Sequence, residues 1–171
     1  MTNQSIPEKE RQQKVEEFFN ENTWRVEATF PCITETHYHP NVHEAYAVIQ
    51  GSSTLILGLD VRNIPSKMTS DQLEEIEKKT EIQVKLGDVI VIPAGVSHCS
   101  KNYTKNYRYV AAYPTNGEKY KSVGKGQVER NEGKYDNHDD IEQSIKAAFP
   151  LGDPVCGKGP GQIKANYNDL T

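Results

Sequence analysis

The chain has no basic stripe, no long apolar run and no pair of closely spaced cysteines. Its 171 residues carry a formal net charge of -4 with both signs interleaved. We therefore expect neither a nucleic acid nor an anionic membrane among its partners. No apolar run approaches the roughly 20 residues that span a membrane. The N-terminus lacks the basic flank and apolar core of a secretory signal.

Cysteine usage bears on the compartment in which the protein works. The sequence contains Cys32, Cys99 and Cys156, an odd number that lie far apart without a Cys-x-x-Cys pair. This pattern argues against a disulfide framework and favours a reducing environment. We therefore expect a cytoplasmic protein.

Large apolar residues are scarce at both ends of the chain, in 1–22 and 115–171, and are concentrated in 26–59 and 84–113. A chain of this length can bury a core of its own. We therefore predict a single domain over residues 1–171, with its barrel core at about 25–113 and a C-terminal extension after it.

The middle of the chain reads as a series of short strands. From Arg25 to Phe30, apolar and polar residues alternate with a period of two, which is typical of a half-buried strand. Further strands are predicted at 34–39, 44–50, 53–59, 81–86, 88–92, 97–101 and 107–113. Gly-containing turns at 50–53 and 86–88 predict hairpins. Short strands joined by such turns predict an all-β antiparallel sandwich or barrel.

Three helices are predicted outside these strands. Residues 7–21 form the first, and the tandem Phe18-Phe19 indicates that it packs on the domain. Within the interruption at 60–80, Thr69 is a helix N-cap and Gln72 completes a capping box. A third helix is predicted at 138–148. The Pro- and Gly-rich stretches that follow, 150–154 and 157–161, are expected to hold no regular structure.

Two histidines and a glutamate lie at strand spacing in one stretch. Residues two apart in a strand point to the same face, so His37 and His39 project together. Glu44 and Tyr46 share one face of the next strand, and Glu44 meets the two imidazoles if that face is the barrel interior. His98 begins a later strand, and an adjacent antiparallel position would complete the set.

Three imidazoles and one carboxylate suit a divalent transition metal, with Fe, Mn or Ni favoured and Zn or Cu as alternatives. An octahedral ion held by four such ligands keeps two open positions, which activation of a substrate or of dioxygen requires. A tetrahedral zinc with all four ligands would be closed, and hence structural. The other alternative is a metal-free pocket in which the four side chains hydrogen-bond to one another.

Two spaced patterns contain these residues: His37-x-His39-x4-Glu44-x6-Gly51 and Gly87-x5-Pro93-x-Gly95-x2-His98-x3-Asn102. Together they resemble the two signature motifs of the cupin superfamily, and the first has the four-residue His-to-Glu gap of germin-like members. One position departs from the family pattern, because Pro31 stands where a glycine is usual.

A narrower resemblance extends almost to the C-terminus. The stretches that carry it are 37–44, 112–114 and 150–157, which are similar to the uncharacterised, single-domain YjlB-like cupins of microbes. The resemblance implies a double-stranded β-helix (jelly-roll) barrel, with helices at the N-terminus, between the motifs and near the C-terminus. It also implies a homodimer. The metal ligands that it implies are His37, His39, Glu44 and His98.

A site of this kind supports three classes of function. We favour a metal-dependent enzyme, an oxygen-using oxidoreductase of dioxygenase or oxidase type, that acts on a small organic molecule. Glu44 is then a ligand and a candidate catalytic base. The alternatives are a non-redox isomerase, lyase or decarboxylase that stabilises an oxyanion, and a non-catalytic module that binds a small ligand or a metal.

Three further residues near the motifs have two interpretations each. Tyr46 shares the face of Glu44, and Tyr113 is predicted near the barrel mouth, so both are candidate substrate-binding residues. Either one could instead fill the core or the sheet surface. His43 could be a fifth ligand or a proton shuttle, but it lies one step from Glu44, so its side chain is expected to point outward, to the surface or to a supporting contact.

Overall fold

The computed structural model describes residues 6–59, 69–124 and 138–158. Its helices are α1 (Glu8–Glu21), α2 (Ser70–Thr80) and α4 (His138–Lys146). Its strands are β1 (Trp24–Phe30), β2 (His37–Tyr38), β3 (Glu44–Gln50), β4 (Ser52–Leu57), β5 (Glu81–Lys85), β6 (Val89–Ile92), β7 (His98–Tyr103), β8 (Arg108–Pro114), β9 (Val123–Gly124), β10 (Gly152–Asp153) and β11 (Gly157–Lys158). None of the described helices is both long and apolar enough to cross a membrane.

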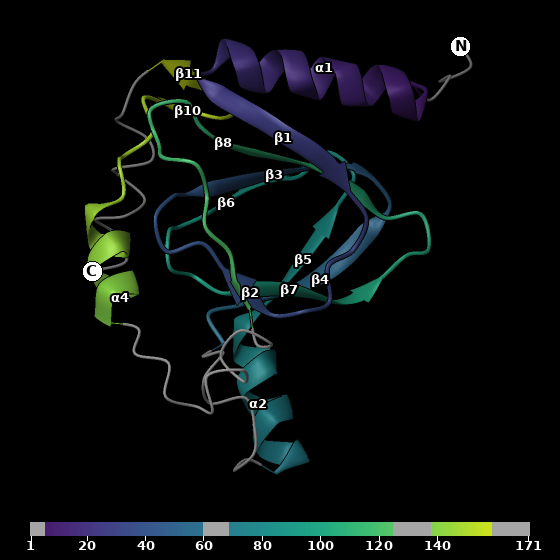
Figure 1. The fold of residues 1–171 in the computed structure, drawn as a ribbon. Helices are drawn as coiled ribbons and strands as arrows, with labels where there is room; N and C mark the ends of the chain where they lie inside the picture. The colour runs from purple at the N-terminus through teal and green to yellow at the C-terminus, as the bar shows by residue number, and fades with distance from the viewer. Residues whose placement is uncertain (1–5, 60–68, 125–137, 159–171) are drawn as a thin grey trace.

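The long strands form two antiparallel sheets, which confirms the predicted jelly-roll barrel. The first sheet has the strand order β1-β8-β3-β6, and the second has the order β5-β4-β7-β2-β9. The sheets face each other around a common interior, with α1 across the outer side of the first sheet and α2 projecting away from the second (Figure 1). A separate two-stranded pair, β10-β11, lies near the C-terminal end.

The predicted strands are present with shifted ends, and one of them is much shorter than expected. Of the predicted strand 34–39, only His37 and Tyr38 pair with neighbours. Pro40 follows shortly, and proline cannot donate to a strand ladder. The turns at Gly51 and Gly87 are present, with φ values of 69° and 95° that favour glycine. The predicted hairpins are wrong, because each turn joins strands of different sheets, β3 to β4 and β5 to β6, which do not pair with each other.

The predicted helices are present as α1, α2 and α4. Thr69 caps α2 and forms the expected capping box with Gln72. Of the interruption at 60–80, residues 60–68 lie outside the described part of the chain. Phe19 is fully buried, as a packed α1 requires, while its neighbour Phe18 is exposed.

The prediction that 150–154 and 157–161 hold no regular structure is wrong for the described residues. Gly152 and Asp153 pair with Lys158 and Gly157 in a small antiparallel hairpin. The Asp153 carboxylate accepts hydrogen bonds from the backbone N–H groups of the next turn at 2.7 and 2.8 Å. Local hydrogen bonds of this kind satisfy backbone groups that a Pro- and Gly-rich sequence leaves without a longer ladder.

Strand β3 separates two apolar clusters. Tyr46 and Val48 point into the barrel interior, where Leu55, Ile92 and Tyr109 also lie. Its alternate residues, among them Ala47 and Ile49, pack outward with Phe19 of α1. Because side chains alternate along a strand, Glu44 shares the interior face with Tyr46, as predicted. The sheet thus directs the carboxylate into the barrel.

The C-terminal extension packs along the barrel strand that bears the first histidine. Within it, β9 pairs with β2. The Tyr38 hydroxyl donates a hydrogen bond to an Asp140 carboxylate oxygen on α4 at 2.7 Å. The Trp24 indole N–H donates to the Gly152 carbonyl at 2.9 Å. These contacts fasten the extension to a strand of each sheet, β2 and β1.

Candidate metal centre

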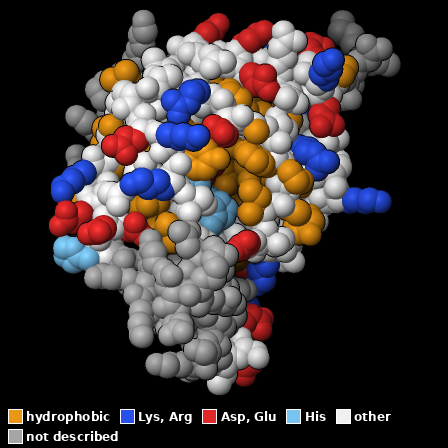
Figure 2. Space-filling view, viewed as in Figure 1, with side chains coloured by type: hydrophobic (Ala, Val, Ile, Leu, Met, Phe, Trp, Pro, Cys, Tyr) orange, Lys and Arg blue, Asp and Glu red, His pale blue; other side chains and the backbone are white. Residues whose placement is uncertain are grey.

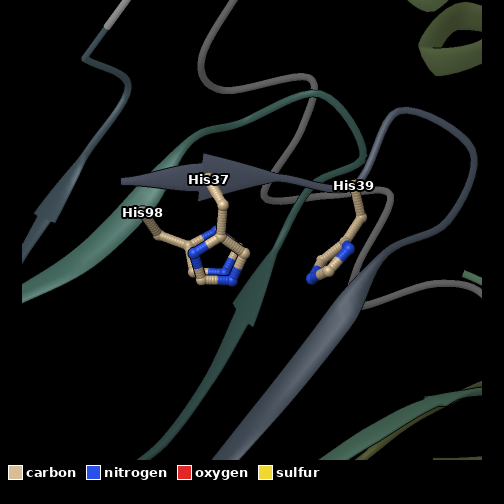
Figure 3. Close-up of side chains that lie close together, drawn as sticks. All are labelled: His37, His39 and His98. Carbon is tan, nitrogen blue, oxygen red and sulfur yellow. The ribbon is translucent and has the colours of Figure 1, made fainter. Parts of the chain in front are cut away.

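Three histidines meet inside the barrel. His37 on β2 is paired in register with His98 at the start of β7, and His39 follows β2 directly. The ring centroids are 4.3 Å apart for His37 and His98, 5.4 Å for His37 and His39, and 5.5 Å for His39 and His98. One nitrogen from each ring lies within 4.8 Å of the others. The three rings point toward a common space (Figure 3).

Glu44 reaches this cluster from the opposite sheet. Its Oε2 atom lies 3.1 Å from Nε2 of His39 and 3.2 Å from Nε2 of His98. The residue is only 4% exposed. The four side chains that the sequence predicts as ligands are therefore grouped, with the carboxylate adjoining two of the three imidazoles.

Each imidazole has its Nδ1 atom against a backbone carbonyl. His37 Nδ1 lies 2.9 Å from the Glu35 oxygen, and His39 Nδ1 lies 2.7 Å from the Lys121 oxygen. His98 Nδ1 lies 3.2 Å from its own acceptor, the Val96 oxygen. A carbonyl oxygen can only accept, so each Nδ1 must carry the proton. In a neutral ring this leaves the Nε2 lone pair free, which is the arrangement found in metal-ligating histidines.

The atoms that face one another at the centre lack hydrogen-bond partners. Among the described residues, neither Glu44 Oε2 nor His98 Nε2 has one, although both are buried. A bare imidazole nitrogen and a carboxylate oxygen are both acceptors, so their approach is unfavourable unless a proton or a cation lies between them. The donor set of three imidazole nitrogens and one carboxylate fits a divalent transition metal.

The electrostatics of the cluster keep these groups in ligand form. Burial, and then the charge of nearby His98, lowers the pKa of His37 from 6.5 to about 4, so its ring is neutral near neutral pH. Burial opposes ionisation of Glu44, but the adjacent His39 and His98 outweigh it and lower the Glu44 pKa to about 2. The site thus presents a neutral imidazole at His37 and an ionised carboxylate at Glu44.

Two tyrosines border the cluster. The Tyr113 hydroxyl donates a hydrogen bond to Glu44 Oε1 at 2.9 Å. The Tyr46 ring lies 5.7 Å from the His98 ring and 4.0 Å from the Tyr109 ring. Tyr46 is only 3% exposed. The structure therefore places Tyr113 on a candidate ligand and Tyr46 in the interior wall beside another.

His43 lies outside the cluster, and the surface location that was one of its expected roles is wrong. The residue is 7% exposed, and its Nδ1 accepts a hydrogen bond from the Ala94 backbone N–H at 3.1 Å. Its ring lies 5.8 Å from that of Phe149 in the C-terminal extension. The extension contacts His43 just before β3, which a sequence pattern confined to the barrel does not reveal.

Sequence reasoning missed the part of the extension that touches the cluster. Lys121 supplies the carbonyl for His39, and the Tyr120 ring lies 5.2 Å from the His39 ring and stacks on Tyr113 at 4.7 Å. A backbone carbonyl has no sequence signature. The only local hint is Asn41, which lies two residues after His39 and contacts the same segment.

The cluster is not sealed within the described part of the chain. His37 is half-buried, whereas His39 and His98 are 5% and 2% exposed. Viewed down the barrel, a histidine side chain is visible near the middle of the face, with hydrophobic side chains beside it (Figure 2). Of the three histidines, His37 is therefore the one most exposed to solvent.

The fold and the site define a cupin, and comparison with known proteins agrees. Residues 26–131, more than half of the 171-residue chain, match the cupin family, and the chain belongs to it. The chain is 29% identical over 123 residues to the uncharacterized protein YjlB of Bacillus subtilis (strain 168). That alignment covers 71% of this chain and 59% of YjlB, less than two thirds of the relative's length.

One solved structure aligns with part of the chain. It is the 11S globulin from Wrightia tinctoria, a structure that reveals an auxin binding site. The TM-score is 0.38 at 13% sequence identity, and the alignment covers 73% of this chain and 31% of the globulin.

Proposed function

We propose that this cupin is a metal-dependent enzyme that oxidises a small organic molecule with dioxygen. His37, His39, His98 and Glu44 are the proposed ligands of one divalent ion, with Fe, Mn or Ni favoured over Zn or Cu. The proposal includes a homodimer as the working form. The observation that carries it is the group of imidazoles whose Nδ1 atoms are all occupied by carbonyls, with their Nε2 atoms left to converge.

The donor set explains why an open site is proposed. Three imidazoles and one carboxylate leave two positions of an octahedral ion for substrate and dioxygen. Bound there, the metal would supply Lewis acidity and a template for both reactants. The chain's own part is to hold the ligands rigidly, and each Nδ1 hydrogen bond restrains the rotation of one imidazole ring.

Glu44 is held as a ligand by contacts on both of its oxygens. Tyr113 donates to Oε1, and Oε2 faces His39 and His98. A carboxylate with a pKa near 2 is a weak base. Proton transfer by Glu44 therefore requires it to move away from the imidazoles that lower its pKa. Its proposed catalytic role depends on that movement.

The interior wall supports a small, largely apolar substrate. The barrel cluster around Tyr46 consists mainly of aliphatic and tyrosine side chains. Tyr46 and Tyr113 are the proposed substrate contacts, since the Tyr113 hydroxyl binds Glu44 and the Tyr46 ring lies 5.7 Å from that of His98. Apolar walls exclude water from the site, so a metal held by the four ligands would act on the substrate in a medium of low polarity.

The first test is elemental analysis of protein purified without chelators and without a metal affinity column. We expect about one transition-metal ion per chain. Oxygen uptake is then measured with a panel of small organic substrates, and uptake that requires the bound metal supports the oxidoreductase. Turnover of a substrate without oxygen uptake would assign the non-redox enzyme instead. Protein that contains no metal and cannot be reconstituted would overturn the proposal.

A further inference from the structure

The three imidazole Nδ1 hydrogen bonds differ in origin. For His37 and His98 the acceptor is the carbonyl two residues upstream, so these bonds are available wherever the local chain conformation is correct. For His39 the acceptor is Lys121, 82 positions away in the sequence. The orientation of His39 therefore depends on how a distant segment is held against the barrel.

Asn41 holds that segment. Its Nδ2 donates to the Lys119 carbonyl at 2.9 Å, and its Oδ1 accepts from the Lys121 backbone N–H at 2.9 Å. A longer contact, 3.3 Å, joins Nδ2 to a Glu118 carboxylate oxygen. Asn41 is 6% exposed. One buried amide thus binds the backbone of Lys119 and of Lys121, and the carbonyl of Lys121 faces His39.

The same segment reaches a second candidate ligand. Tyr120, between the two backbone groups that Asn41 binds, lies edge-on to the His39 ring and stacks on Tyr113. Tyr113 in turn donates to Glu44. Displacement of the segment would therefore disturb the His39 acceptor and the aromatic support of the Glu44 hydrogen bond together.

A second contact also restrains the segment, but it lies at the surface. The Lys121 ammonium donates to the Gln143 side chain on α4 at 2.6 Å, and this pair is exposed. Exposed polar pairs contribute little to positioning because their side chains remain free to move in solvent. The buried, two-point contact of Asn41 is the stronger restraint on the backbone.

We propose that Asn41 is a positioning residue of the metal centre. By holding residues 119–121, it keeps the Lys121 carbonyl on His39 Nδ1, so that the ring carries its proton there and presents Nε2 to the ion. The inference concerns which nitrogen of His39 carries a proton in the metal-free protein. It rests on the proposed function only in assuming that this arrangement serves to bind a metal.

The test uses ¹⁵N NMR of histidine-labelled, metal-free protein near neutral pH. In the unsubstituted chain, the His39 ring is expected to carry a proton at Nδ1, against the Lys121 carbonyl, with or without a second proton between Nε2 and Glu44. In Asn41→Ala, the ring is expected to populate a form protonated at Nε2 alone, because its carbonyl partner is no longer held. Zinc, used as a redox-silent probe, is expected to bind about 10- to 100-fold more weakly, as with other losses of an outer hydrogen bond.

Asn116→Ala is the matched control. Asn116 also donates a side-chain hydrogen bond to a backbone carbonyl of the extension, that of Phe149, at 2.9 Å. No described hydrogen bond joins Asn116 to a proposed ligand. This variant is expected to keep both the His39 tautomer and the zinc affinity. Equal losses in both variants would show that Asn41 acts only through general stability of the extension.

Two results would overturn the inference, and they are separate from failure of the proposed function. One is a His39 ring that lacks a proton at Nδ1 in the unsubstituted, metal-free protein, a measurement that does not require any variant to fold. The other is a folded Asn41→Ala protein with unchanged tautomer and zinc affinity. Protein that binds no metal at all would refute the proposed function, yet the tautomer measurement would still decide the role of Asn41.

Discussion

At the scale of single residues, the metal centre depends on which nitrogen of each imidazole carries the proton. The carbonyls of Glu35, Val96 and Lys121 each face an Nδ1 atom, so Nε2 is the nitrogen left on each ring, and those of His39 and His98 lie beside Glu44. A histidine with the opposite tautomer would place an N–H where a ligand atom is needed. The backbone therefore selects the ligand form before any ion is bound.

The contribution of a single ligand can be tested at His98. We expect His98→Ala to lose most of its bound metal, because one of three imidazole donors is removed, and to remain folded, because the apolar cores do not include His98. Elemental analysis measures the expected loss of metal, and the circular dichroism spectrum shows whether the variant is folded. Full metal retention in His98→Ala would show that the ligand assignment is wrong.

His43→Ala is the matched control, since it removes a buried imidazole that lies outside the cluster. Its Nδ1 accepts from the Ala94 N–H, and a buried donor left without a partner costs roughly 1–3 kcal/mol. We therefore expect a lower free energy of unfolding in urea and a nearly unchanged metal content. Metal loss comparable to that of His98→Ala would place His43 among the ligands.

At the scale of elements, helix α4 packs against the turn that leads to His98. A Cβ atom added to Gly95 would lie only 2.9 Å from the Ser144 Cβ on α4, which is closer than real side chains approach. The φ of Gly95 is also positive, at 81°. The turn and the helix therefore require glycine for two reasons, one conformational and one steric.

We expect Gly95→Ala to displace α4 from the turn and to lower the melting temperature. Gly58→Ala is the control, because Gly58 has a similar φ of 75° but nothing within 4 Å of an added Cβ. The strain of a positive φ, roughly 1–2 kcal/mol, is common to both variants. The excess loss in Gly95→Ala measures the contact with α4, and equal losses would show that this contact contributes nothing.

At the scale of the whole molecule, the site joins the two sheets. Glu44 belongs to β3 of the first sheet, whereas His37 and His98 belong to β2 and β7 of the second. The polar groups are held together by the packing of the barrel, so their ionisation is linked to its stability. This linkage makes the stability of the metal-free protein depend on pH.

We expect the metal-free protein to lose stability as the pH falls. Unfolded His37 binds a proton near pH 6.5, but the folded residue binds one only near pH 4. In that window the unfolded chain holds more protons, so acid favours unfolding, by roughly 3 kcal/mol at the lower end. The pKa of Glu44 is 4.5 in the unfolded chain and about 2 in the folded protein. By the same reasoning, the loss of folding stability continues as the pH falls from 4.5 to 2.

Urea unfolding in the presence of a chelator, at a series of pH values, measures this dependence. His37→Gln is the informative variant, because it removes one of the two histidines whose pKa burial lowers, His37 and His43, and keeps a polar side chain. Its free energy of unfolding is expected to change less between pH 6.5 and 4, and His43 accounts for the remainder. An unchanged pH dependence in this variant would show that His37 is not buried as a neutral ring.

Sequence periodicity predicted most of the barrel and its helices because the signals for them are local. Alternation placed Glu44 and Tyr46 on one face of β3, and the capping box of Thr69 located the start of α2. The small hairpin at 152–158 was missed because its pairing relies on Asp153 turn contacts in a segment rich in Pro and Gly. The burial of His43 was missed for a different reason, since it depends on an extension distant in sequence.

By itself, the sequence determined the identity of the candidate ligands and the class of fold, because residue type and strand period are written in each short stretch. Only the tertiary structure decided how those ligands are held. The Lys121 carbonyl on His39, the Tyr113 hydroxyl on Glu44 and the cover over His43 all come from segments far apart along the chain. Backbone carbonyls are common to every residue, so only packing can select the one that meets a given ring.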